Sequence, residues 1–287
     1  MSAKIYLSSL REIVDPAGAM VSVFDRGFLY GDSVYETVRT AGPHVLELRR
    51  HLARLRRSAD GIGMVLPFSE DHLRTKLMDT IAAADNAASR ARVVVTRGTG
   101  PMALDTRLSS DPLLVIYVQE LELPHAATYQ RGLSAAIANP SDVAHPGLKT
   151  GNYLPNILAL RQAIERAGDD AIMCNQRGLV TEGATSNVFV SRSGRLSTPT
   201  LASGLLAGIT RCVVFELCEA AGSSVEACEL TLDALRASDE IFLTSSVRGI
   251  MPVTRLDGAV VGTGRVGPRT SQVMGAYDDY VKRASRE

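Results

Sequence analysis

The chain has 287 residues, and its 31 basic and 31 acidic side chains give a formal net charge of zero. A hydrophobic fraction of 45% supports a folded core and excludes an intrinsically disordered chain. The neutral charge balance argues against a general nucleic-acid-binding or membrane-surface protein, because such proteins are usually basic.

The sequence also lacks the signals of export and of metal binding. No apolar run approaches the roughly 18 residues of a membrane span, and the first residues lack the apolar stretch of a secretory signal. The 4 cysteines form no Cys-x-x-Cys pair, which predicts reduced thiols in a cytoplasmic protein. The 5 histidines have no metal-ligand spacing, so we expect them on the surface or in loops and predict no metal site.

The first third of the chain mixes helices with short strands. Apolar residues recur at spacings of three and four over 46–63, which predicts a helix. The β-branched runs Val93–Thr96 and Leu113–Gln119 predict two strands with a loop between them. The predicted helix carries five arginines whose roles periodicity alone does not separate: Arg49, Arg50, Arg54, Arg56 and Arg57.

The pattern changes at residues 121–132, which we interpret as a linker between a small domain at 1–120 and a larger domain at 133–287. In the larger domain we expect a strand over 133–138, a loop over 139–151 and a helix from Pro155 to Gly168. The further expected elements are hairpins of 171–174 with 179–181 and of 188–192 with 195–198, a helix over 209–221 and a strand over 240–245. These elements predict an α+β fold.

Several polar segments of the larger domain could build a site for an anionic cofactor. Lys149 directly precedes a predicted helix, and Glu182 lies in the segment Thr181–Asn187. Leu206–Arg211 opens another helix, and a helix N-terminus binds anions through its backbone N–H groups. A turn of small polar residues at 244–246 ends a strand. The segments could thus supply a lysine nucleophile, a carboxylate and two phosphate-binding turns.

The chain resembles the class IV, or fold-type IV, pyridoxal-phosphate aminotransferases, the group of branched-chain aminotransferases, D-amino acid aminotransferases and aminodeoxychorismate lyases. The motifs that carry the resemblance are Asp25–Asp32, His51–Leu55, Leu148–Tyr153, Thr181–Asn187, Gly208–Arg211 and the turn 244–253, in this order. Together they extend over nearly the whole chain. The resemblance implies a small N-terminal α/β domain, a larger barrel-like C-terminal α/β domain and a homodimer.

The resemblance also implies pyridoxal 5′-phosphate as the cofactor and assigns roles by position. Lys149 matches the lysine of the Schiff base, where only a primary amine can condense with the cofactor aldehyde. Glu182 matches the carboxylate at the pyridine nitrogen, and Arg54 matches the helix arginine that contacts the phosphate. The expected cofactor contacts are Arg54, Lys149, Tyr153, Glu182, Thr185, Ser186, Asn187, Leu206, Gly208, Ile209, Thr210, Ser245 and Ser246.

Residues 35–39 match the specificity strand of the family, where alternation places Tyr35, Thr37 and Arg39 on one face. Arg39 fits the branched-chain enzymes, whereas Thr37 resembles the aminodeoxychorismate lyases. D-amino acid enzymes tend to have a lysine in place of Arg39, and their Arg-x-His carboxylate clamp is replaced here by Met102-Ala103-Leu104. The expected substrate contacts are Tyr30, Tyr35, Thr37, Arg39, Arg97 and Val247.

We therefore predict a pyridoxal-phosphate-dependent class IV aminotransferase. Its ping-pong reaction would move an amino group between an apolar, branched-chain-like amino acid and a 2-oxo acid such as 2-oxoglutarate, through the Schiff base of Lys149. One alternative is an aminodeoxychorismate lyase, which eliminates pyruvate to give 4-aminobenzoate, and another is a D-amino acid or amine transaminase. A cofactor-binding protein without turnover is the alternative outside enzymology. Arg107 and Arg248 are further candidates for the anchor of the substrate carboxylate.

Overall fold

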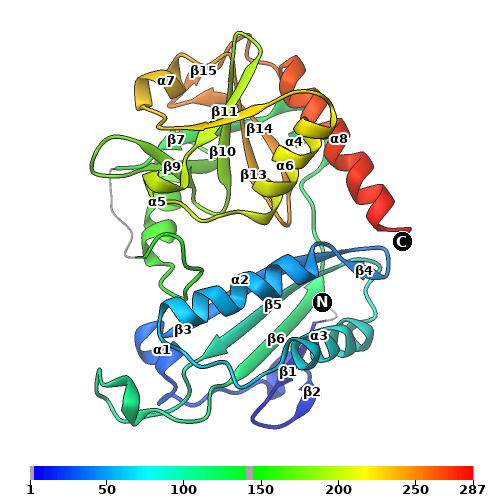
Figure 1. The fold of residues 1–287 in the computed structure, drawn as a ribbon, viewed down its shortest axis with the longest axis vertical. Helices are drawn as coiled ribbons and strands as arrows, with labels where there is room; N and C mark the ends of the chain where they lie inside the picture. The colour runs from blue at the N-terminus through cyan, green and yellow to red at the C-terminus, as the bar shows by residue number, and fades with distance from the viewer. Residues whose placement is uncertain (1–2, 140–144, 287) are drawn as a thin grey trace. The chain divides into compact units, whose positions relative to one another are not determined.

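The structure is a computed structural model that describes residues 3–139 and 145–286, and its chain forms two compact units (Figure 1). Unit 1 comprises residues 1–122, 148–152 and 284–287, and unit 2 comprises residues 123–147 and 153–283. The short segment 148–152, which carries Lys149, therefore belongs to unit 1 although the chain has already entered unit 2. Each unit has its own sheet and its own hydrophobic core.

Unit 1 contains a six-stranded antiparallel sheet with the strand order β2-β1-β6-β5-β3-β4. Its strands are β1 (Lys4–Leu7), β2 (Glu12–Val14), β3 (Ser33–Ala41), β4 (His44–Val45), β5 (Ser89–Thr96) and β6 (Leu114–Glu120). In β5, alternate residues (Ala91, Val93 and Val95) are buried and pack in the core, as the period of two in a strand requires. The predicted strands at 93–96 and 113–119 are confirmed as parts of β5 and β6.

Helices α2 (Leu48–Gly61) and α3 (Glu70–Ala84) pack against this sheet, and the short α1 (Arg26–Tyr30) precedes β3. Leu52, Leu55 and Ala59 of α2 are buried in the core at helical spacing, which confirms the helix predicted over 46–63. Ser69 caps α3 by accepting a hydrogen bond from the backbone N–H of His72. Short 3-10 turns lie at Pro16–Gly18 and Thr106–Leu108.

Unit 2 contains a nine-stranded mixed sheet with the order β12-β11-β10-β13-β14-β7-β8-β9, and β15 pairs with β14. Its strands are β7 (Leu133–Ile137), β8 (Asp170–Cys174), β9 (Val180–Gly183), β10 (Asn187–Arg192), β11 (Arg195–Pro199), β12 (Val225–Cys228), β13 (Glu240–Ser245), β14 (Gly249–Leu256) and β15 (Ala259–Val260). Val188 and Val190 of β10 pack in one core while Phe189 packs in another. Both faces of this sheet are therefore buried, and the α+β class is confirmed.

The helices of unit 2 are α4 (Ala126–Arg131), α5 (Leu154–Glu165), α6 (Ile209–Ala220), α7 (Leu232–Arg236) and α8 (Pro268–Ala284), and a 3-10 turn spans Leu201–Ser203. Helix α4 lies within residues 121–132, for which we predicted an interdomain linker. It is fixed to unit 2 because Tyr129 packs against the core and donates a hydrogen bond to the carbonyl of Arg248, 2.8 Å away. Of the loop predicted over 139–151, residues 140–144 lie outside the described residues.

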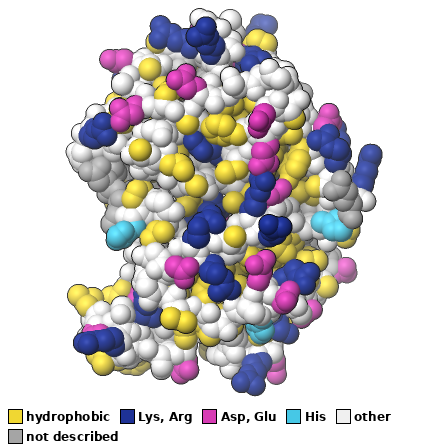
Figure 2. Space-filling model, in the orientation of Figure 1, with side chains coloured by type: hydrophobic (Ala, Val, Ile, Leu, Met, Phe, Trp, Pro, Cys, Tyr) yellow, Lys and Arg dark blue, Asp and Glu magenta, His cyan; other side chains and the backbone are white. Residues whose placement is uncertain are grey.

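The surface agrees with the neutral composition. On the face that Figure 2 shows, basic, acidic and hydrophobic side chains are interspersed. In the described part of the chain, no helix has the length and apolarity that crossing a membrane requires.

Candidate functional site

Lys149 is held against strand β3 of unit 1 by its own backbone. The Lys149 carbonyl accepts a hydrogen bond from the N–H of Tyr35 (3.0 Å), and the Lys149 N–H donates to Oγ of Ser58 on α2 (3.0 Å). The N–H of Gly151 donates to the carbonyl of Ser33 (2.8 Å). The Nζ atom of Lys149 lies 4.5 Å from the ring centroid of Tyr35. The lysine therefore has a fixed position although its segment has no regular secondary structure.

One face of β3 carries the residues expected to contact substrate, together with an arginine that the sequence analysis missed. Thr37 lies opposite Arg92 of β5 in the sheet register. The Arg92 guanidinium lies 4.6 Å from the ring centroid of Tyr35, and its Nε donates to Oγ1 of Thr37 (3.4 Å). The Tyr35 ring thus contacts two cations, Lys149 and Arg92. Strand pairing brings Arg92 to this face, and no local sequence signal marks it.

The opposite face of β3 carries a buried ion-pair network around Glu36, whose side chain is 0% exposed. Arg54 donates from Nε to Oε1 of Glu36 (2.7 Å) and from Nη2 to Oε2 (2.8 Å). His51 Nδ1 lies 2.7 Å from Glu36 Oε2. Although burial raises the pKa of Glu36, the hydrogen bonds and charges of Arg54 and His51 lower it to about 2. Arg54 is therefore oriented by two parallel bonds to an ionised carboxylate.

This network corrects one expectation and singles out one arginine of α2. We expected every histidine on the surface or in a loop, but His51 is a buried helix residue because it faces Glu36. Arg56 and Arg57 are exposed and Arg50 pairs with Glu47, whereas Arg54 is buried. Ser58, one helical turn after Arg54, is the residue that accepts the Lys149 N–H. Helix α2 therefore holds the expected phosphate arginine and the lysine segment together.

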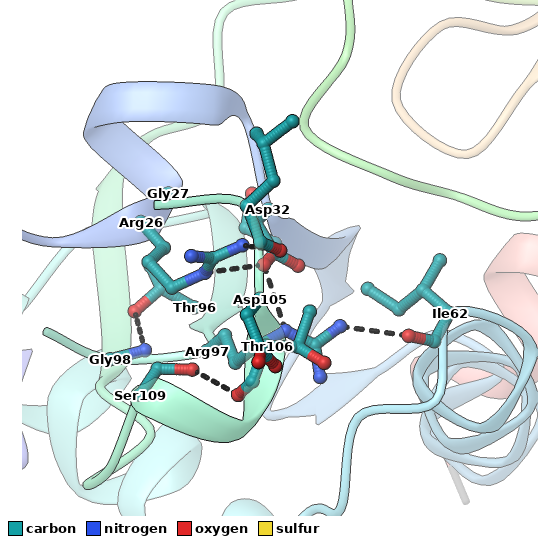
Figure 3. Close-up of polar contacts among 12 residues, drawn as sticks. Arg26, Gly27, Asp32, Ile62, Thr96, Arg97, Gly98, Asp105, Thr106 and Ser109 are labelled. Atoms are coloured by element: carbon teal, nitrogen blue, oxygen red, sulfur yellow. Dashed lines mark hydrogen bonds and ion pairs between the residues drawn. The ribbon is translucent and has the colours of Figure 1, made fainter. Parts of the chain in front are cut away.

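Arg97 directly follows β5 and lies in a cluster of charged side chains (Figure 3). Its guanidinium donates to Asp32 and to the carbonyls of Ile62 and Gly63, at 2.8, 2.8 and 2.9 Å. These bonds occupy its Nε, Nη2 and Nη1 atoms, so Arg97 fastens three segments of unit 1 to each other. Tyr30 lies at the same cluster, with its ring centroid 5.1 Å from Cζ of Arg26.

In unit 2, the amide of Asn187 brings Glu182 and Leu206 together. Asn187 Nδ2 donates to the carbonyl of Leu206 (2.9 Å) and to Oε2 of Glu182 (3.4 Å). The same Glu182 oxygen accepts the N–H of Leu206 (3.2 Å). Tyr153 lies close by, since its hydroxyl donates to the carbonyl of Ala184 (3.2 Å) in the turn after Glu182. Glu182 and Asn187 therefore form one hydrogen-bonded group with Leu206, which lies 19 residues after Asn187.

The N-terminus of α6 has the donors that an anion needs. Its cap residue, Gly208, has no side chain that could accept from the first-turn N–H groups. Among the described residues, the buried hydroxyls of Ser186 and Thr244 have no hydrogen-bond partner within the protein. These two hydroxyls lie at the adjacent ends of β10 and β13, where Asn187 pairs with Thr244. Backbone donors and hydroxyls without a carboxylate partner fit a phosphate group.

Gly208→Ala is expected to weaken cofactor binding and to lower the free energy of unfolding by about 2 kcal/mol. The reason is that a Cβ at position 208 would collide with Oδ1 of Asn187, whose amide holds Glu182 and Leu206. Urea unfolding and cofactor titration would measure the two effects. Gly275→Ala is the matched control, because a Cβ there would meet no atom within 4 Å. Equal behaviour of the two variants would refute this expectation.

The turn after β13 is tied to the turn that follows Glu182 by Arg248. Arg248 Nη2 donates to Oδ2 of Asp170 (2.6 Å) and to Oγ1 of Thr185 (3.4 Å), and the Arg248 N–H donates to Oγ of Ser245 (3.2 Å). Ser246 and Val247 lie half-buried in this turn. Arg248 is therefore engaged with a carboxylate.

The remaining arginine candidates differ in their surroundings. Arg107 is exposed and pairs with Asp105, from which Nη2 is 2.7 Å away. Arg39 is buried on β3, where it lies opposite Arg90. Among the residues that the structure describes, no group of three His, Cys, Asp or Glu side chains could hold a metal ion.

Comparisons with known proteins agree on one family. The sequence model of class IV aminotransferases matches residues 33–256. A Methanocaldococcus jannaschii protein that carries the provisional name branched-chain-amino-acid aminotransferase is 34% identical over 279 residues, which is 96% of each chain. A D-alanine aminotransferase of Bacillus licheniformis is 33% identical over 94% of each chain. The structure of a branched-chain aminotransferase of Escherichia coli superposes with a TM-score of 0.91 at 26% identity and covers 98% of this chain and 95% of its own.

Proposed function

The chain belongs to the class IV aminotransferases, a pyridoxal-phosphate-dependent family with the fold-type IV architecture, and we propose that it transfers amino groups between an apolar, branched-chain-like amino acid and a 2-oxo acid such as 2-oxoglutarate. The observation that carries this proposal is the position of Lys149. Its backbone is fixed to β3 and α2, and its amine lies over Tyr35 on the face that also holds Thr37 and Arg92.

Each unit contains residues that fit a part of pyridoxal phosphate. In unit 2 we assign the phosphate to the N–H groups at the start of α6 and to the hydroxyls of Ser186 and Ser246, and in unit 1 the resemblance assigns a phosphate contact to Arg54. Glu182, held by Asn187 and the Leu206 N–H, is the carboxylate that we assign to the pyridine nitrogen. The cofactor supplies the electron-withdrawing ring that makes the substrate Cα–H acidic. Lys149, as a neutral amine, would take up the Cα proton and return a proton on the product side.

The substrate class rests on the face of β3. Tyr35 offers an apolar ring to a branched side chain, and Arg92 offers a guanidinium to a carboxylate. The names of the Methanocaldococcus jannaschii and Escherichia coli proteins support a branched-chain substrate. The Bacillus licheniformis relative favours a second candidate, a D-amino acid transaminase. Thr37 matches the residue that is typical of the lyases at this position. It therefore supports pyruvate elimination as the third candidate reaction.

We also propose that the enzyme is a cytoplasmic homodimer. Unit 1 exposes large apolar side chains in two segments: Phe28 (70% exposed) in α1, and Met102 (77%) and Leu104 (79%) in the loop after β5. The two segments are neighbours, since Arg26 bonds to the carbonyls of Ala103 and Leu104. Hydrophobic side chains gather over this loop at the lower left of Figure 2. A second copy of the chain would bury them.

Single amino acids added to the holoenzyme without an acceptor separate the candidate reactions. We expect L-leucine, L-isoleucine or L-valine to convert the bound cofactor stoichiometrically to its amine form, as read from the absorption spectrum. Conversion by D-alanine but not by L-leucine would identify a D-amino acid transaminase. Pyruvate released catalytically from aminodeoxychorismate, with no conversion by any amino acid, would replace the proposal with the lyase.

A further inference from the structure

A half-buried carboxylate in unit 1, that of Asp32, joins two arginines that come from distant parts of the sequence. Oδ2 of Asp32 accepts hydrogen bonds from Nε of Arg26 (2.9 Å) and from Nε of Arg97 (2.8 Å). Figure 3 shows the two guanidinium groups approaching Asp32 from different elements. The side chains of Arg26 and Arg97 are 4% and 10% exposed. Although burial raises the pKa of Asp32, the bonds from Arg97 and Arg26 lower it below its usual value, so the carboxylate is ionised.

The two arginines use their other donors in different ways. Arg97 donates to the carbonyls of Ile62 and Gly63, which follow the C-terminal end of α2, where a cation is favoured. Arg26 instead reaches the loop between β5 and β6. Its Nη1 donates to the carbonyl of Ala103 (2.6 Å) and its Nη2 to that of Leu104 (3.4 Å). Asp32 therefore connects the helix of Arg54 with the loop.

Different contacts hold the base and the tip of the loop, residues 98–111. Its base is held by the backbone, since the Arg26 N–H donates to the Gly98 carbonyl (2.9 Å) and Thr99 bridges to Ser110. At the tip, Met102 and Leu104 are exposed and bury little apolar surface within the described chain. The two hydrogen bonds from the Arg26 guanidinium, at 2.6 and 3.4 Å, therefore tie the tip to the rest of unit 1.

Arg26 also contacts Tyr30, which we expect to touch substrate. The guanidinium lies over the Tyr30 ring while its edge points to Asp32 and to the loop carbonyls. We propose that Arg26, oriented by Asp32, is a positioning residue for substrate selection, which holds the loop 98–111 and the Tyr30 ring in one fixed arrangement. The selection part rests on the proposed function. The contacts of Arg26 with Asp32 and with the loop lie within unit 1 and do not depend on the proposed function.

Arg26→Gln separates this role from general stability, because it removes the loop bonds and leaves the Asp32–Arg97 pair in place. Trypsin can cut the loop after the exposed Arg107 once the tip opens. We expect cleavage there to become about ten-fold faster or more, since two bonds to a charged group are lost. In the holoenzyme, the KM for the preferred amino acid should rise about ten-fold, while kcat changes less than three-fold. The ratio of kcat/KM between the preferred amino acid and the others should become smaller.

Two further variants sharpen the test. Arg26→Lys keeps the charge but lacks the planar fork, so it should behave like Arg26→Gln rather than restore the wild type. Arg161→Gln, which removes an exposed pair with Glu165, should leave the cleavage rate and the KM values unchanged.

Wild-type cleavage and KM values in Arg26→Gln would overturn the proposal, and so would rescue by Arg26→Lys. A uniform loss of kcat with a large fall in melting temperature would also overturn it, because it would show a role in stability alone. A wild-type holoenzyme without transamination would refute the proposed function, while faster cleavage of Arg26→Gln in that case would still support the tie.

Discussion

Lys149→Ala is expected to lower kcat for transamination by about 10⁴-fold or more, because the alanine side chain has no amine that could form the bond to the cofactor or move the Cα proton. The substitution should leave the fold intact, since the side chain is half-buried and the contacts that fix the segment are made by the Lys149 backbone. Steady-state kinetics and thermal unfolding would measure both effects.

Lys282→Ala is the matched control for this prediction. Lys282 is exposed near the end of α8, where it pairs with Asp279. We expect the control variant to retain wild-type turnover. If Lys149→Ala protein were active within ten-fold of the wild type, the assignment of the nucleophile would be wrong.

Glu36→Gln is expected to lower the free energy of unfolding by about 3 kcal/mol, because it leaves the buried Arg54 guanidinium without its carboxylate. The affinity for pyridoxal phosphate should fall with it, since Arg54 loses the two bonds that orient it. Urea unfolding and cofactor titration would measure the two quantities. Glu165→Gln, which removes an exposed pair on α5, should change the free energy of unfolding by less than about 0.5 kcal/mol.

The same carboxylate predicts how stability depends on pH. Its folded pKa of about 2 lies below the ordinary value of 4.5, so the unfolded chain binds the proton more readily. The stabilisation by Glu36 is therefore complete above pH 4.5 and is lost as the pH falls towards 2. In Glu36→Gln the free energy of unfolding should fall less steeply over this interval than in the wild type. Parallel curves for the two proteins would contradict the ion-pair assignment.

Local sequence patterns predict the elements whose structure depends mainly on their own residues and little on tertiary contacts. The helix at 46–63 has a regular apolar spacing, and the hairpin of β10 and β11 turns at Ser193-Gly194, where both residues have positive φ. The long α8 was not predicted, because Gly275 interrupts its pattern and its buried residues are few. Helix α4 was missed for a similar reason, since it is fixed by a tertiary bond from Tyr129.

The residues of the candidate site also differ in whether the local sequence or tertiary contacts determine their positions. Lys149, Glu182 and the start of α6 lie in short motifs that a sequence comparison can match. Arg92 and Glu36 have their places only through strand register and packing, since Arg92 meets Thr37 across the sheet and Glu36 meets Arg54 from the next helix. Periodicity could not separate Arg54 from its neighbouring arginines, because the buried carboxylate that selects it lies 18 residues away in the sequence.

The central claim is that Lys149 binds the cofactor covalently, and reduction of the holoprotein with sodium borohydride tests it most directly. Reduction makes the bond between the cofactor and its amine permanent, so mass spectrometry of proteolytic peptides can locate it. We expect the phosphopyridoxyl group on Lys149 and on none of Lys4, Lys76 and Lys282. A modified peptide that carries one of those three lysines, with Lys149 unmodified, would contradict the claim.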